Sequence, residues 1–365
     1  MSNSEPCMFL QQSVRMLVAG GAGFCLRADA PILTLSPEEV RRVLIQMGGP
    51  PKKAITPKGE LKKVTAKRFF GSVLFVLMFS IAVFAQTPVP DVATWVVEIG
   101  SRYRIEANIS YVGTSNHAAK LDVYTPRNAS ATAPVPTVIY IHGGGWMGGD
   151  KNGSVLQLLP YLEMGWAAVN VDYRGGPATA PAAVEDSRCA LRWVIRNAQK
   201  YNFDVNKLIV TGESAGGHLA LITGLLPSSA GLDGEGSGPQ ELKVAAIVNW
   251  YGVTDVVDVL EGANQQPFAV RWLSGLPNPK ETARRVSPLQ YVRAGLPAIL
   301  TIHGDADRVA PYSHAVRLHK ALDEARVPNQ LLTIPGGNHG SFKRDEFIRI
   351  YATIREFLKK QGIAK

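Results

Sequence analysis

Residues 208–226 read LIVTGESAGGHLALITGLL, and this stretch indicates a strand that passes through a tight turn into a helix. An apolar, β-branched run precedes GESAG (212–216), and a series of helix formers follows it directly. Such a passage holds its central residue in strained backbone angles, and small neighbours relieve the crowding. The Ser214 hydroxyl would then stand above a sheet and beside a helix N-terminus, where developing negative charge is favoured. This context, more than the GxSxG pattern, predicts a nucleophilic serine.

The chain around this turn alternates short apolar strands with helical patterns from about residue 118 onward. Apolar runs of this length between helices are typical of parallel strands buried on both faces, which predicts an α/β fold with a mostly parallel, doubly wound sheet and flanking helices. A long segment, 253–286, could lie over the site as a small lid. The expected strands are KLDVYTP (120–126), TVIYIHG (137–143), WAAVNVDY (166–173), LIVTGES (208–214), VAAIVNWYG (244–252), AILTIHGD (298–305) and QLLTIPGG (330–337), and the expected helices are 185–201, 216–226, 313–326 and 343–361.

The formal charge of +9 is concentrated in the N-terminal part of the 365-residue chain. Residues 1–85 hold 11 Lys/Arg against 5 Asp/Glu, which leaves 28 against 25 in the remainder. The remainder carries no basic run with interleaved aromatic residues, so the composition does not indicate a nucleic-acid partner.

The N-terminal part contains a segment that resembles a secretory signal. KGELKKVTAKR precedes 17 uncharged residues, 69–85, that end on the small residue Ala85. This order predicts export to the periplasm or outside, with cleavage near Ala85; an uncleaved membrane anchor is the alternative. The expected organisation is an N-terminal extension (1–68), the signal-like segment (69–85) and a catalytic domain (86–365). Membrane contact is expected only through the signal-like segment, and the oligomeric state is left open.

Three consecutive glycines, 143–145, follow the expected strand at 137–141 in IHGGGW. Glycine costs conformational entropy, so a triplet is tolerated where φ must be positive or where backbone N–H groups must approach a ligand closely. A phosphate or the oxyanion of an acyl-transfer reaction would both fit such a loop. No GK[ST] sequence follows the triplet, which weighs against phosphate.

A serine nucleophile needs a histidine base and a carboxylate that orients it. His339 lies in a glycine-rich loop, PGGNHGSF, after the last expected strand, whereas His314 and His319 lie in a helical pattern and are expected to be exposed or at a helix cap. Asp307 in HGDADRVAP is the expected orienting acid. Asp305 beside it is expected to brace the turn, and Asp255 after the preceding strand is the competitor for the same role.

Four motifs of this chain and their chain order resemble those of the α/β-hydrolase superfamily: HGGGW, GESAG, HGDADRV and GGNHG. HGGGW, YRG and SAGGHLA resemble the carboxylesterase/lipase family related to hormone-sensitive lipase, near bacterial esterases similar to arylformamidases and carbohydrate esterases. The resemblance covers about residues 100–362. Glu213 departs from the Asp of many relatives of hormone-sensitive lipase, and Trp146 favours the arylformamidase-like branch.

This resemblance implies a Ser-His-Asp triad of Ser214, His339 and Asp307 and an oxyanion hole formed by backbone N–H groups. The oxyanion hole maps onto Gly144, Gly145 and Ala215 of this chain. The aromatic residues expected to line the substrate pocket are Trp146, Trp250 and Tyr251.

The expected function is therefore that of a serine carboxylic-ester hydrolase that works through an acyl-enzyme on short-chain or carbohydrate-linked acyl esters. Neither a metal nor an organic cofactor is implied. An arylformamidase or a dipeptidyl-type peptidase would use the same residues, and a non-catalytic binding protein of this fold is the remaining alternative. Cys189, on a helical pattern, is expected to be a buried apolar residue without a redox role.

Overall fold

The computed structural model describes residues 92–112, 119–234 and 242–365. The predictions for residues 1–91, including the signal-like segment 69–85, lie outside this part of the chain. Among the described residues no helix is long and apolar enough to cross a membrane.

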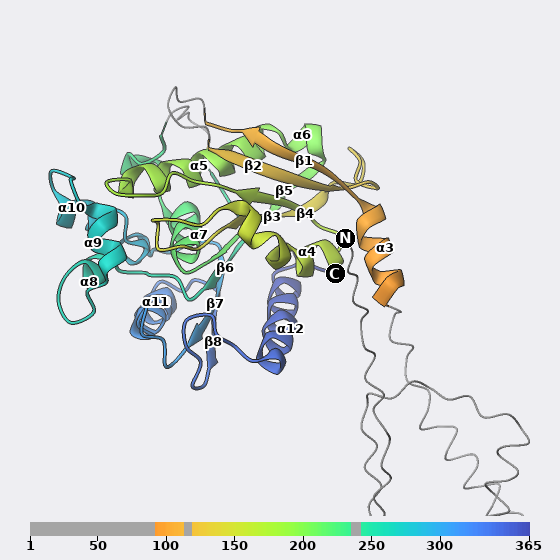
Figure 1. Cartoon of the computed structure of the whole chain (residues 1–365). Coiled ribbons are helices and arrows are strands. Elements are labelled where there is room, and N and C mark those ends of the chain that lie inside the picture. The colour runs from red at the N-terminus through yellow and green to blue at the C-terminus, as the bar shows by residue number, and fades with distance from the viewer. Residues whose placement is uncertain (1–91, 113–118, 235–241) are drawn as a thin grey trace, which may run out of the picture. The chain divides into compact units, whose positions relative to one another are not determined.

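An eight-stranded sheet forms the centre of the molecule, in the order β1-β2-β4-β3-β5-β6-β7-β8 (Figure 1). Six neighbouring strands, β4, β3, β5, β6, β7 and β8, are parallel to one another, as the apolar runs predicted. The strands are β1 (Tyr103–Ser110), β2 (Lys120–Pro126), β3 (Val135–Ile141), β4 (Ala167–Val171), β5 (Phe203–Glu213), β6 (Ala246–Trp250), β7 (Ala298–Gly304) and β8 (Asn329–Ile334).

The direction of β2 was predicted wrongly, because β2 runs antiparallel to both of its neighbours, β1 and β4. Burial on both faces gives a strand an apolar sequence whichever way it runs, so the pattern carries no information on direction. The edge strand β1 was not predicted, since most of its side chains are exposed and it lacks an apolar run.

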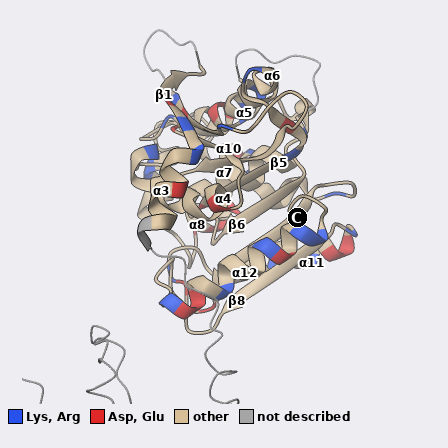
Figure 2. Ribbon diagram, turned by 90° about the vertical axis from the view of Figure 1, so that its right-hand side faces the viewer, with Lys and Arg blue, Asp and Glu red and all other residues tan. Residues whose placement is uncertain are grey.

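Successive residues of the central strands face two different helical layers. Ile139 and Ile141 of β3 belong to a core cluster with helices on one face, whereas Val138 and Tyr140 pack toward α4, α12 and the 3₁₀ helix η1 on the other. Figure 2 shows acidic and basic residues interspersed along α12. The helices of the first layer include α5 (Ala180–Arg196), α7 (Ala215–Leu225), α8 (Val256–Leu260), α9 (Pro267–Leu273), α10 (Pro279–Arg285) and α11 (Ser313–Glu324); those of the second are η1 (Lys151–Leu158), α4 (Leu159–Glu163) and α12 (Arg344–Lys360). Two further helices are α3 (Val92–Arg102) and α6 (Ala198–Tyr201).

The turn between β5 and α7 lies directly against the end of β3. A Cβ atom added at Gly216 would lie 2.0 Å from the carbonyl oxygen of Ile141, and one at Gly212 would lie 2.4 Å from the same atom. Backbone atoms cannot move aside as a flexible side chain can, so the two flanking residues of the turn must be glycine.

Gly216→Ala is therefore expected to lower the free energy of unfolding by about 3 kcal/mol, the upper part of the range for overpacked sites. Gly100→Ala in α3 is the matched control, because an added Cβ there meets nothing within 4 Å. Replacing a helical glycine by alanine stabilises by up to about 1 kcal/mol. Urea unfolding followed by circular dichroism measures both variants; equal stabilities would contradict the packing of this turn.

Candidate active site

Ser214 occupies the turn between β5 and α7 in a strained backbone conformation. Its φ is 54° and its ψ is −117°, a combination that an L-residue adopts at a cost. The Ser214 N–H donates to Trp250 O at 2.9 Å, and the Ser214 carbonyl accepts from the His218 N–H at 3.0 Å. These bonds to β6 and α7 hold the serine above the carboxyl ends of the parallel strands.

Ser214, His339 and Asp307, three residues from separate loops, form a continuous chain of hydrogen bonds. His339 Nε2 lies 2.8 Å from Ser214 Oγ, and His339 Nδ1 lies 2.7 Å from Asp307 Oδ2. Since the carboxylate can only accept, Nδ1 carries the hydrogen and Nε2 is free to accept from the serine hydroxyl. The side chains named from the sequence are thus brought together in the order that nucleophilic catalysis requires.

Asp307 is held in place by both of its carboxylate oxygens. Oδ1 accepts from the N–H groups of Val309 and Ala310 at 2.8 and 3.0 Å, while Oδ2 faces His339. His303 Nε2 lies 3.4 Å from Oδ2 and 2.8 Å from Ala310 O. Burial alone would raise the pKa of Asp307, but the hydrogen bonds from the two histidines and the Val309 N–H outweigh it and hold the pKa well below its usual range. Asp307 therefore remains a carboxylate at neutral pH.

The two competing acids have other partners. Asp305 accepts from the Gly336 N–H at 2.6 Å and so braces the loop after β8, in keeping with the expected bracing role. Asp255 caps the N-terminus of α8 through the Val257 N–H and pairs with Arg317 Nη1 at 2.8 Å. Among the three acids, which all lie in the described part of the chain, Asp307 alone bonds His339, and it does so at Nδ1.

The glycine loop borders the same cavity as the serine and the histidine. Gly144 and Gly145 have φ values of 118° and 59°, which favour glycine, and the Gly144 carbonyl turns away to accept from the Met147 and Gly148 N–H groups. In the described part of the chain, neither Gly144 nor Gly145 donates its own N–H to a backbone carbonyl. Ala215 begins α7, so its N–H has no carbonyl one turn earlier in the helix.

This site cavity has a volume of about 430 Å³ and lies open to solvent. Ser214, His339 and the glycine triplet line it, and Phe268 of α9 contributes the apolar wall. Phe268 belongs to the segment 253–286, so this segment borders the site as expected. Its movement as a lid stays a prediction.

Trp146 does not line the site, and its prediction as a pocket residue was wrong. The side chain is fully buried beneath the glycine loop, where it stacks on Trp272 with ring centroids 4.2 Å apart. Its indole Nε1 donates to His218 Nδ1 at 3.1 Å, and His218 Nε2 bonds Val286 O at 2.7 Å. A tryptophan after a glycine loop can therefore support the loop from below, a role that the sequence pattern does not distinguish from pocket lining.

Trp250 and Tyr251 do border a cavity, which adjoins the one at Ser214. Tyr251 and Glu213 line both cavities, and the Tyr251 hydroxyl donates to Glu213 Oε2 at 2.9 Å. The Tyr251 ring also packs edge-on against His339, with centroids 4.7 Å apart. Sequence reasoning noted Glu213 only as a departure from relatives; its position next to Ser214 at a strand end was the signal for a site role.

His314 and His319 were expected to be exposed or at a helix cap, and both are buried. His314 accepts the Thr254 N–H at its Nδ1 and bonds Asp258 through Nε2, and His319 bonds Asn329. The helical periodicity places both histidines outside the apolar face of α11, which is why exposure was expected. They are buried because polar groups of other elements pack against them and bond their ring nitrogens. Cys189 is buried, as expected.

No group of three or more His, Cys, Asp or Glu side chains within residues 92–112, 119–234 and 242–365 is arranged to hold a metal ion.

Comparison with known proteins assigns the family and agrees with the fold. The BD-FAE family model matches residues 121–322. The chain is similar to esterase 2 of Thermogutta terrifontis, with a TM-score of 0.61 and 24% identity to the apo form, over 72% of this chain and 96% of that one. For the propionate-bound form the TM-score is 0.59 and the identity 26%, over 72% and 96% of the chains. The mostly parallel sheet with flanking helices is the α/β-hydrolase fold, so this prediction is confirmed.

Curated relatives include two proteins of Mycobacterium tuberculosis. The chain is 32% identical to esterase LipC over 61% of this chain and 57% of the relative. It is 30% identical to the probable carboxylic ester hydrolase LipM over 63% and 54%, respectively. The chain thus spans little more than half the length of these relatives.

The support that His218 gives to the glycine loop depends on pH. Burial lowers the pKa of His218 from 6.5 to about 4, although its hydrogen bond to Val286 O acts in the opposite direction. Between these two values the unfolded chain binds more protons than the folded one, so stability falls as pH drops. Over the whole window His218 accounts for a loss of about 3 kcal/mol.

His218→Asn, which keeps an acceptor for Trp146, is expected to lose less stability than the wild type between about pH 7 and about pH 4. Urea unfolding at several pH values measures the difference. The same pH dependence in both proteins would show that His218 is not the group that resists protonation.

Proposed function

The chain belongs to the BD-FAE family of α/β-hydrolase esterases, and we propose that it is a serine carboxylesterase that works through an acyl-enzyme. The observation that carries the proposal is the hydrogen-bonded chain from Ser214 Oγ through His339 to Asp307. The esterase names of the relatives support ester hydrolysis, and the geometry supports these three residues as the triad.

In the proposed acylation step, His339 Nε2 takes the proton of Ser214 as Oγ attacks the ester carbonyl. Asp307 holds the imidazole in the tautomer that can accept this proton and stabilises the positive charge that the ring then carries. His339 returns the proton to the leaving alcohol, which departs and leaves an acyl group on Ser214. Water attacks this acyl group in the second half of the reaction, with His339 again acting as the base.

The negative charge that develops on the carbonyl oxygen is assigned to the backbone N–H groups of Gly144, Gly145 and Ala215. The free N–H groups of the glycine loop and the N-terminus of α7 support this assignment, since both lie beside Ser214. Donors fixed in advance are worth about 3–4 kcal/mol each to such a transition state.

The proposed substrates are short-chain or carbohydrate-linked acyl esters. The cavity at Ser214 is open, which suits a substrate that continues beyond the ester. Structures of the similar Thermogutta terrifontis esterase 2 hold propionate or butyrate, which supports a short acyl group here.

Replacing the nucleophile separates an enzyme from a binding protein. Wild-type protein is expected to react with one equivalent of a fluorophosphonate per chain, and Ser214→Ala with none, as measured by intact mass. Hydrolysis of p-nitrophenyl acetate should fall by about 10⁶-fold in kcat, as in dissected triads of other enzymes. Unchanged hydrolysis by a folded Ser214→Ala variant would place the nucleophile elsewhere.

Replacing the acid tests the triad against its competitor. Asp307→Asn is expected to lower kcat for the same ester by about 10⁴-fold, because an amide no longer fixes the reactive tautomer. Asp255→Asn is the matched control: asparagine caps a helix about as well as aspartate, so the variant should lose mainly the ion pair with Arg317, at most about 1 kcal/mol, and keep kcat within a few-fold of wild type. Equal losses of activity would remove Asp307 from the triad.

A further inference from the structure

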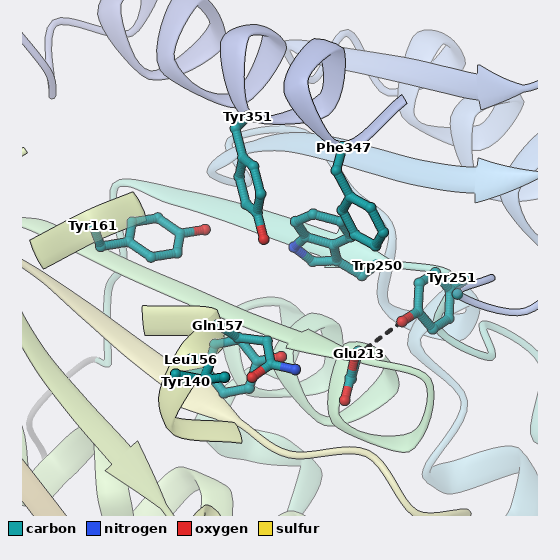
Figure 3. Close-up of a pocket in the computed structure, with 10 residues that line it drawn as sticks. Tyr140, Leu156, Gln157, Tyr161, Glu213, Trp250, Tyr251, Phe347 and Tyr351 are labelled. Carbon is teal, nitrogen blue, oxygen red and sulfur yellow. Dashed lines mark hydrogen bonds between the residues drawn. The ribbon is translucent and has the colours of Figure 1, made fainter. Parts of the chain in front are cut away.

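A second cavity of about 290 Å³ adjoins the site and is lined mainly by aromatic side chains (Figure 3). Trp250, Tyr351 and Phe347 form one side of it, Tyr140 lies opposite, and Tyr161 lies at one end. It shares Glu213, Tyr251 and Gly340 with the cavity at Ser214, so a group bound in it can belong to an ester held at the serine.

The lining of this aromatic cavity carries a carboxylate and no basic group. Glu213 is its one acidic residue, and none of its ten lining residues is Lys, Arg or His. Burial raises the pKa of Tyr140, Tyr251 and Tyr351, and the charge of Glu213 raises it further, so the phenols stay neutral at neutral pH. The cavity therefore presents negative charge from Glu213 alone.

Several polar atoms of the wall have no hydrogen-bond partner. Gln157 Oε1 and Tyr161 Oη are buried and have no hydrogen-bond partner among the described residues. Thr211 lies near the Tyr161 hydroxyl, but its own hydroxyl donates to Val248 O. Figure 3 shows the Tyr161 hydroxyl directed toward the space between the side chains. Glu213 is only partly buried: Tyr251 donates to its Oε2, and its Oε1 has no hydrogen bond in the described part of the chain. Buried polar atoms without partners cost free energy unless a ligand satisfies them.

We propose that this aromatic cavity is a subsite for a substituted ammonium group, carrying at least one N–H, on the ester substrate. Aromatic faces attract cations through their quadrupole, and the carboxylate of Glu213 neutralises the charge. The N–H donates to a carboxylate oxygen of Glu213 or to Gln157 Oε1, and these oxygens can only accept. A neutral apolar group leaves these acceptors unpaired, and an anion is repelled by Glu213.

This inference rests on the proposed esterase function, and two pairs of isosteric esters test it. 2-(Dimethylamino)ethyl acetate differs from 3-methylbutyl acetate only by a protonated nitrogen in place of a CH group on the alcohol. Methyl 4-(dimethylamino)butanoate and methyl 5-methylhexanoate differ in the same way on the acyl side. At neutral pH, acid release in a pH-stat gives kcat/KM for each, and the cationic ester of at least one pair should be favoured by roughly tenfold or more.

Variants assign the preference to the aromatic cavity. Glu213→Gln keeps an acceptor for Tyr251 but removes the charge, so the ratio within the favoured pair should fall to about one. Because Glu213 adjoins Ser214, the ratio is used, since a general loss of activity cancels in it. Gln157→Leu, which is not next to the serine, should lower the ratio as well. Asp345→Asn is the control, because this carboxylate is almost fully exposed and outside the cavity lining.

Absence of a preference in both pairs, or a preference that survives Glu213→Gln, overturns the subsite. Calorimetric titration with N,N-dimethylbutylammonium chloride gives a readout without turnover. Ser214→Ala should bind this ion, and Ser214→Ala combined with Glu213→Gln should bind it at least about tenfold more weakly. Binding of the ion without hydrolysis of any ester would refute the esterase function and keep the subsite. Ester hydrolysis without binding of the ion would refute the subsite and keep the esterase function.

Discussion

The contact of the β5–α7 turn with the end of β3 is the constraint on which the site depends. Gly212 and Gly216 bring the turn so close to Ile141 O that no side chain fits between them. This approach fixes Ser214 in its strained conformation and places the glycine loop, which follows directly after β3, beside the serine hydroxyl. A single backbone contact thus sets the distance between the nucleophile and the donors assigned to the oxyanion.

The sequence was sufficient to predict the residues whose position follows from topology. Ser214, Asp307 and His339 each follow a parallel strand, and parallel strands end at the same edge of a sheet, so their meeting was predictable from order alone. The direction of β2 was not predictable, because a buried strand has the same apolar residues whichever way it runs. The position of Trp146 was not predictable either, because an aromatic residue after a glycine loop can lie on either side of that loop. The burial of His314 and His319 was not predicted, because their partners, Asp258 and Asn329, lie on other elements of the fold.

Glu213 and Tyr251 connect the proposed chemistry with the proposed selectivity. Tyr251 has a positive φ of 38°, packs against His339 and donates to Glu213, so one residue contacts both the proposed base and the carboxylate that lines the two cavities. A substrate group that engages Glu213 would therefore be held at a fixed position relative to the reacting atoms. Positioning of this kind lowers the entropic cost of reaction.

The central claim is that Ser214 carries the acyl group during turnover. The most direct measurement is acid quenching of the wild-type protein within milliseconds of mixing with p-nitrophenyl acetate, followed by peptide mass spectrometry. The account predicts one acetyl group on the peptide that contains Ser214, formed as the first equivalent of p-nitrophenol is released and lost during the following turnovers. Acetylation of another residue that forms and decays at the rate of turnover, with Ser214 unmodified throughout, would contradict it.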